Sequence, residues 1–255
     1  ELKTYDFCLD VLARDGHALE FVPNVLKTEE LCEKAVSNDG DALQYVPNEL
    51  KTAKLCEIAV SRHGYALEFV PNELKTEELC EKAVSNDGDA LRYVPNELRT
   101  PELCELAISG SYRNVLKYVP IILRTTDICR SAVHNSPYNI LFVPKKKKTE
   151  ELCRMAVEKN PRCISVIPAE MITKDLCELA FTKFYGSVRN IPKKILTYEL
   201  CKMAVLINGS AIRYIPKKYI TDELQTIAAN NNCVNDEIAN DDENDHDEEN
   251  DHDER

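Results

Sequence analysis

The sequence is poor in glycine and lacks the short motifs that mark common reaction sites. Only seven of its 255 residues are glycine, and there is no glycine-rich stretch of the kind that cradles phosphate groups. A serine in a G-x-S-x-G turn is also missing. Zinc-finger spacing is absent, because no two cysteines stand closer than Cys153 and Cys163. These absences predict a protein that is not an enzyme, with no catalytic residues, no metal ligands and no cofactor.

What the chain does contain is one sequence repeated along its length. Residues 27–50, KTEELCEKAVSNDGDALQYVPNEL, return at 75–98 with a single change, Gln44 to Arg92. Repeat one also resembles repeat three, which indicates that a pair of repeats was the older unit of duplication. The 24-residue period is interrupted once, by one extra residue inside the turn sequence SGSYRNVL. Cysteine marks the phase at Cys8, Cys32, Cys56, Cys80, Cys104, Cys129, Cys153, Cys177 and Cys201.

The first half of each repeat predicts an amphipathic helix. In repeat two, Thr28 is a good N-cap, and the two glutamates that follow place negative charge on the first turn. Apolar residues then recur at helical spacing, which predicts one buried stripe. The stripe consists of Leu31, Cys32, Ala35 and Val36.

The second half predicts a turn and a shorter helix. Gly40 is expected at the end of the first helix in the left-handed conformation that glycine adopts easily. Asp41 can cap the shorter helix, and Pro47 ends it, because proline disfavours helical geometry in the preceding residue. The chain opens on Glu1-Leu2, which matches Glu49-Leu50, so the array is expected to begin within a repeat.

Stacked repeats of this kind predict an all-α fold. We expect an α-solenoid of nine to ten helix–turn–short-helix repeats over residues 1–230, because neither short helix can bury its stripe alone. Leucine-rich repeats have a similar period and are the alternative. They need leucines alternating along a strand, where this sequence places Glu33 and Lys34.

The pattern LCxxAVxxxGxALxYVPxxLKT resembles a tandem repeat known as a domain of unknown function. That domain is often defined over about two such units and occurs in multi-copy arrays of giant amoeba viruses, protists and bacteria. The resemblance covers residues 3 to about 224 and weakens in repeats seven to nine. It implies a helical array and a viral origin, and it carries no catalytic residues.

Eleven cysteines, nine of them at one helix position, suggest a packing role. Equivalent positions in stacked repeats lie too far apart for disulfides, so cysteine is expected to serve as a small buried apolar residue. Free thiols on this scale favour a reducing compartment, the cytoplasm or nucleus, or the host cytoplasm if the protein is viral. His17, His63 and His134 are expected to stand singly in solvent.

Charge is sorted along the chain. Residues 1–120 hold 22 acidic and 13 basic residues, and residues 121–233 hold 10 acidic and 18 basic residues. The segment 231–255 is strongly acidic and predicts a disordered tail. Such a tail either masks the basic half electrostatically or only aids solubility.

Two surface columns vary while the scaffold stays fixed. One lies three residues before each proline, and its neighbours are apolar, so we expect it to face solvent. The other comprises the two residues after each proline. The aromatic column two before proline, which includes Tyr45 and Phe69, is either half-buried packing or a base-stacking ladder. From these columns and the lysine run at 145–148 we predict partner-binding residues: Arg92, Lys117, Lys145, Lys146, Lys147, Lys148, Arg189, Lys193, Lys194, Arg213, Lys217 and Lys218.

The function expected from these features is a non-enzymatic scaffold for protein–protein interaction, by analogy with other solenoids. The alternative is a nucleic-acid-binding solenoid that uses the basic half, 121–233, with the acidic tail as a mask. We expect a monomer that does not interact with membranes.

Overall fold

The computed structural model describes the backbone of residues 2–235 and the side chains of residues 5–231. The predicted acidic tail therefore lies outside the described residues, except for 231–235. That short stretch continues the last α-helix rather than starting a tail. The disorder of the tail and its masking of the basic half stay predictions.

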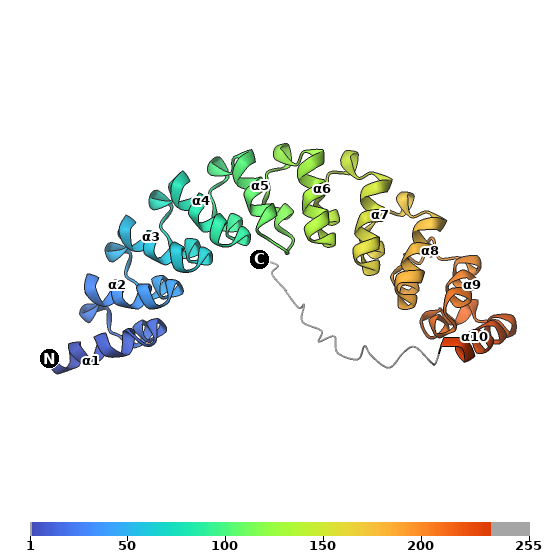
Figure 1. Cartoon of the computed structure of the whole chain (residues 1–255), viewed down its shortest axis with the longest axis horizontal. Helices are drawn as coiled ribbons and strands as arrows, with labels where there is room; N and C mark the ends of the chain where they lie inside the picture. Colours follow the sequence, from blue (N-terminus) through green and yellow to red (C-terminus); the bar gives the residue numbers. More distant parts are fainter. Residues whose placement is uncertain (1, 236–255) are drawn as a thin grey trace. The chain divides into compact units, whose positions relative to one another are not determined.

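The chain divides into two compact units, Glu1–Lys159 and Asn160–Arg255. Within residues 2–235 every regular element is helical and no strand occurs, which confirms the all-α prediction and excludes leucine-rich repeats. Successive α-helices of each unit pack side by side (Figure 1). The first unit contains α1 (Leu2–Leu12), α2 (Glu29–Asn38), α3 (Ala53–Arg62), α4 (Glu77–Asn86), α5 (Pro101–Ser109), α6 (Thr126–Asn135) and α7 (Glu150–Lys159). The second contains α8 (Lys174–Lys183), α9 (Tyr198–Ile207) and α10 (Asp222–Asn235).

Each α-helix up to α9 is followed by 3₁₀ helices rather than by a second α-helix. The first of them usually spans six residues and ends two residues before the proline, and a three-residue 3₁₀ turn usually follows the proline. The longer ones are Gly16–Phe21, Gly40–Tyr45, Gly64–Phe69, Gly88–Tyr93, Val115–Tyr118, Pro137–Phe142, Pro161–Val166, Tyr185–Asn190 and Gly209–Tyr214. The short ones are Asn24–Leu26, Asn48–Leu50, Asn72–Leu74, Asn96–Leu98, Ile121–Leu123, Lys145–Lys147, Ala169–Met171 and Lys217–Tyr219.

Threonine begins α2 to α10 as predicted. The Thr28 hydroxyl accepts a hydrogen bond from the Leu31 backbone N–H at 3.3 Å, which satisfies one of the free donors of the first turn. The same bond forms at eight further threonines. They are Thr52, Thr76, Thr100, Thr125, Thr149, Thr173, Thr197 and Thr221.

The α-helices end differently from the prediction. Asp39 follows α2 in an extended conformation, with φ −138° and ψ 116°, and its carboxylate accepts a hydrogen bond from the Asp41 N–H at 2.9 Å. Asp39, not Asp41, is therefore the cap of the 3₁₀ helix. No glycine among the described residues has a positive φ, so the expected left-handed glycine is wrong.

Close packing between repeats explains the glycine instead. A Cβ added to Gly40 would lie 2.4 Å from the carbonyl oxygen of Ala59, on the α-helix of the next repeat. The corresponding distance is also 2.4 Å at Gly16 and Gly64. Glycine at this position lets the 3₁₀ helix of one repeat touch the backbone of the next α-helix.

The core lies between a row of α-helices and a row of 3₁₀ helices in each unit. A 3₁₀ helix packs on the α-helix of its own repeat and on that of the next; Gly40–Tyr45, for example, contacts both α2 and α3. The predicted stripe is buried, because Leu31, Cys32, Ala35 and Val36 are at most 1% exposed. Such burial contributes roughly 25 cal/mol per Å² of apolar surface.

The extra residue of repeat five lies in a turn, as predicted. A side chain of repeat six makes hydrogen bonds to the backbone of this turn. The fully buried Asn139 donates from Nδ2 to the carbonyls of Arg113 and Ala132, at 3.1 and 2.9 Å. Its Oδ1 accepts from the Leu116 N–H at 3.1 Å. Most other repeats place a smaller side chain here, such as Ala42. Asn139 thus satisfies backbone groups that the altered turn would leave unpaired.

Candidate functional site

The variable column three residues before proline is exposed throughout both units. Its nine members are solvent-exposed even though the residue before each one is wholly or largely buried, which confirms the predicted orientation. The members are Glu20, Gln44, Glu68, Arg92, Lys117, Leu141, Ser165, Arg189 and Arg213. Because the column varies from acidic to basic to apolar, it gives each repeat a different surface on a constant scaffold.

Several basic members of this column lie over aromatic rings. The Arg92 guanidinium carbon lies 4.9 Å from the ring centroid of Tyr93 and 5.8 Å from that of Tyr118, in the next repeat. Lys117 Nζ is 4.8 Å from the Tyr118 centroid. In the second unit, Arg189 lies 5.3 Å from the Tyr214 centroid. These cation–π contacts hold the charged groups in place at the surface.

The aromatic column beside it is half-buried. Tyr45, Phe69 and Tyr93 are partly covered, and Tyr65 of repeat three meets the Tyr93 ring edge-on at 6.0 Å. Packing between repeats therefore accounts for these rings better than a freely exposed base-stacking ladder does. Phe21 differs, because 82% of its surface is exposed.

Most of the predicted lysines that follow proline point to solvent. The exposed ones are Lys145, Lys146, Lys193, Lys194, Lys217 and Lys218. Lys218 Nζ also lies 4.4 Å from the Tyr219 ring centroid. The lysine pairs of the second unit share its surface with Arg189 and Arg213 and make that unit locally basic.

Lys147 and Lys148 are less available than their neighbours. Lys147 is half-buried, and its ammonium group donates to the Arg124 carbonyl. Burial lowers the pKa of Lys148. Lys148 occupies the position before the capping threonine, where Lys51 donates to the Phe69 carbonyl at 2.9 Å and ties two repeats together. The sequence did not distinguish these lysines from those facing solvent.

The ten cysteines whose side chains the structure describes are free, and all of them except Cys8 are buried, as predicted. Burial raises the pKa of the Cys80, Cys104, Cys177 and Cys201 thiols to about 11 and that of Cys163 to about 12. A thiol of this kind remains protonated at neutral pH and is a poor nucleophile.

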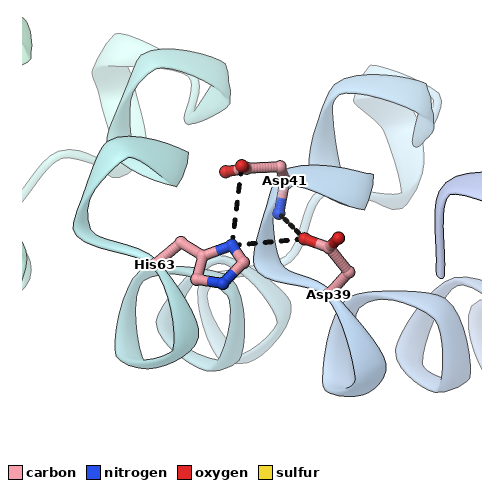
Figure 2. A group of neighbouring side chains, drawn as sticks. All are labelled: Asp39, Asp41 and His63. Carbon is pink, nitrogen blue, oxygen red and sulfur yellow. Dashed lines mark hydrogen bonds and ion pairs between the residues drawn. The ribbon is translucent and has the colours of Figure 1, made fainter. Parts of the chain in front are cut away.

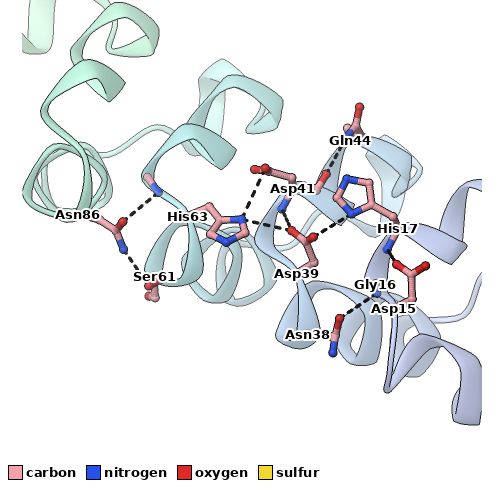
Figure 3. Close-up of polar contacts among 11 residues, drawn as sticks. Asp15, Gly16, His17, Asn38, Asp39, Asp41, Gln44, Ser61, His63 and Asn86 are labelled. Atoms are coloured by element: carbon pink, nitrogen blue, oxygen red, sulfur yellow. Dashed lines mark hydrogen bonds and ion pairs between the residues drawn. The ribbon is translucent and has the colours of Figure 1, made fainter. Parts of the chain in front are cut away.

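The structure brings together one group of metal-ligating side chains that the sequence reasoning missed. Asp39 and Asp41 of repeat two meet His63 of repeat three (Figure 2). His63 Nδ1 lies 3.2 Å from Asp39 Oδ1 and 3.5 Å from Asp41 Oδ2. His17 of repeat one approaches the other oxygen of the same carboxylate, with its Nδ1 2.8 Å from Asp39 Oδ2 (Figure 3). The expectation that His17 and His63 stand alone is therefore wrong, while His134 is exposed on α6.

Asparagines tie the same repeats together beside this group. Asn38 at the end of α2 accepts from the Gly16 N–H at 2.9 Å (Figure 3). It also donates to the Ala13 carbonyl at 2.9 Å. Asn86, the counterpart of Asn38 two repeats further on, donates to the Ser61 carbonyl at 3.0 Å. The contacts thus recur with the duplicated pair of repeats and fix the helix ends that carry the histidines and aspartates.

The residues of this group are far apart in the sequence, so they do not form a local motif, but their spacing follows the repeat. Asp39 and His63 occupy the same position in successive repeats, and His17 precedes Asp39 by slightly less than one repeat. In a stacked array, side chains separated by about one repeat length lie next to each other. The separation of about one repeat therefore predicts from the sequence that these histidines and aspartates lie together.

No helix among residues 2–235 combines the length and the apolar character needed to cross a bilayer. No curated protein and no solved structure matches the chain significantly. The profile of a family described as a domain of unknown function (DUF4116) matches residues 4–51, 54–99 and 76–124. The three overlapping matches are consistent with tandem copies of this domain of unknown function across residues 4–124, and they confirm the predicted resemblance there.

Proposed function

We propose that the chain is a non-enzymatic repeat scaffold that binds a protein partner through its variable exposed columns. The observation that carries this proposal is the exposure of all nine residues three before proline, next to preceding residues that the fold wholly or largely covers. A partner that lies along such a column meets a different side chain in each repeat. Variation there changes the binding specificity at little cost to the core.

The chemistry of the partner follows from the basic residues of the second unit. Arg189 and Arg213 are exposed, and so are the lysine pairs at 193–194 and 217–218. A partner surface that presents Asp and Glu side chains to these groups gains charge-assisted hydrogen bonds. The stacking of Arg189 on Tyr214 reduces the side-chain entropy that the arginine loses on binding.

The buried thiols support the non-enzymatic part of the proposal. Cysteine is the nucleophile that the sequence repeats at a fixed position, yet Cys104 is packed inside, and burial raises the pKa of its thiol. The proposal places the protein's activity at the exposed columns.

Nucleic-acid binding by the basic half, 121–233, is the second candidate. The exposed lysine pairs and the stacked arginines favour it, because phosphate contacts from Lys and Arg supply most non-specific affinity for nucleic acid. In this case the acidic tail competes with phosphate for the same basic side chains and lowers the affinity.

Fluorescence anisotropy separates the two candidates. The full chain is titrated into labelled single-stranded DNA, double-stranded DNA and a labelled poly-glutamate peptide, from low to physiological salt. The scaffold proposal expects saturable binding of the acidic peptide that exceeds binding of either nucleic acid. Stronger, salt-sensitive binding of nucleic acid, increased further in a 1–235 truncation, would favour the second candidate. Binding of none of the three would reject the basic columns as a binding surface.

A further inference from the structure

The group of Asp39, Asp41 and His63 has the geometry of a transition-metal site between two repeats. The candidate ligand atoms, one from each residue, all lie within 4.8 Å of one another (Figure 2). In a tetrahedral zinc site with ligand distances of about 2.0–2.2 Å, neighbouring ligand atoms lie roughly 3.3–3.6 Å apart. The measured separations of 3.2 and 3.5 Å from His63 Nδ1 to the two carboxylates are close to that range.

The Asp41 side chain is 38% exposed, but one of its two carboxylate oxygens, Oδ1, is covered and has no hydrogen-bond partner among the described residues. A buried acceptor without a partner is unfavourable and rare in folded proteins. A cation bound to the other oxygen, Oδ2, would neutralise the negative charge that is delocalised over both oxygens of the Asp41 carboxylate.

Surrounding groups hold the Asp39 carboxylate in position. The Asp41 backbone N–H donates to Asp39 Oδ1 at 2.9 Å, and His17 Nδ1 lies 2.8 Å from Oδ2 (Figure 3). The His17 ring in turn meets the Tyr45 ring edge-on at 5.9 Å. Outer groups of this kind orient ligating carboxylates and raise metal affinity.

The duplicated pair of repeats provides an internal comparison. Asp89 is the counterpart of Asp41, but Ser111 replaces His63, and Tyr65 replaces His17. The Asp89 carboxylate accepts hydrogen bonds from the Ser111 hydroxyl and the Tyr65 phenol, and it pairs with Arg113 Nε at 3.2 Å. A hydroxyl, a phenol and a guanidinium thus satisfy the Asp89 charge in the second copy, whereas in the first copy the His63 imidazole, a metal-ligand group, lies beside Asp41.

We propose that Asp39 Oδ1, Asp41 Oδ2 and His63 Nδ1 bind one divalent transition-metal ion, with Zn²⁺ as the favoured ion and water as the fourth ligand. One imidazole and two carboxylates suit Zn²⁺, which accepts both nitrogen and oxygen ligands in a tetrahedral arrangement. Because the ligands come from two successive repeats, the ion cross-links repeats two and three. His17 acts as a positioning residue through Asp39.

The test is metal binding to the full chain, measured with Zn²⁺ by calorimetry and with Co²⁺ by visible absorption. We expect the wild type to bind one ion with the spectrum of four-coordinate Co²⁺ and without a thiolate-to-cobalt band. H63S, which copies the second site, and D39N should bind this ion at least 100-fold more weakly. D87N is the matched control and should bind like the wild type. H17A should lower the affinity about 10–100-fold while keeping the Co²⁺ spectrum.

Site-specific evidence comes from the His63 imidazole resonances in NMR spectra. We expect them to shift on addition of Zn²⁺ and to saturate at one equivalent. Equal affinity and stoichiometry in the wild type and H63S would overturn the proposal, because the ion would then bind elsewhere, for example at the cysteines or at His246 and His252. A thiolate-to-cobalt band in the wild type would overturn it as well.

Discussion

Replacing Gly40 with alanine tests how the repeats are packed. The added Cβ would lie 2.4 Å from the Ala59 carbonyl oxygen, whereas ordinary van der Waals contact begins at 3.4 Å. The two repeats must therefore separate locally by about 1 Å in a close-packed interior, and overpacking of this kind costs about 1–3 kcal/mol. Alanine also restricts the unfolded chain, which returns about 0.4–1 kcal/mol.

The net expectation for Gly40→Ala is a loss of about 1–2 kcal/mol in the free energy of unfolding. For a chain of this size that loss lowers Tm by roughly 2–8 °C, measured by circular dichroism during heating. Gly110→Ala is the matched control, because its Cβ would meet nothing closer than 3.5 Å and its φ of −92° suits alanine. A Gly40→Ala protein as stable as the Gly110→Ala protein would refute the packing argument.

Three further predictions concern single side chains. Asn139→Ala leaves buried backbone partners without hydrogen bonds and should cost about 2–4 kcal/mol in urea unfolding; a loss below about 1 kcal/mol would contradict its role. Burial raises the pKa of Cys104 from 9.0 to about 11, so the unfolded thiol ionises first and stability should fall between pH 9 and 11. Cys104→Ala should make this decrease in the free energy of unfolding smaller by up to about 1.4 kcal/mol per pH unit. An equal decrease in the wild type and the variant would contradict a raised pKa of Cys104. Thr52→Ala removes an N-cap bond and should cost about 1 kcal/mol, whereas Thr126→Ala, inside the first turn of α6, should cost little. Equal losses of stability in the two threonine variants would contradict the capping role of Thr52.

The features predicted correctly from sequence depend on local chemistry. Thr28 caps α2 because its hydroxyl reaches a backbone N–H three residues away, and this geometry needs no other repeat. The buried stripe beginning at Leu31 follows from helical spacing alone. Exposure of the column that includes Arg92 follows from the apolar character of its neighbours.

The features predicted wrongly depend on contacts with the next repeat. Gly40 resembles a helix C-cap in sequence, but its backbone has no positive φ, and its lack of a side chain serves the contact with Ala59. The shorter helix predicted after Gly40 is present, and its 3₁₀ form accompanies its packing between two α-helices. Sequence reasoning within one repeat contains no information on such contacts.

The candidate site shows the same difference between features that depend on one repeat and features that depend on several. Exposure of Arg189 and Arg213 could be predicted because it is a property of one repeat, whereas the meeting of Asp39 with His17 and His63 is a property of three. The half-buried state of Lys147 likewise depends on the Arg124 carbonyl of the preceding repeat. These residues are neighbours because residues about one repeat length apart in the sequence lie side by side in the stacked array.

The most direct test of the scaffold proposal compares two charge-reversal variants that carry the same change in net charge. R189E/R213E alters the exposed column of the second unit, and K174E/K183E alters exposed lysines on α8 outside it. Binding of the labelled poly-glutamate peptide is measured by anisotropy for both variants and the wild type. Our account predicts that R189E/R213E weakens binding at least tenfold more than K174E/K183E does. Equal weakening in the two variants would show that only net charge matters and would contradict a binding surface formed by the variable column.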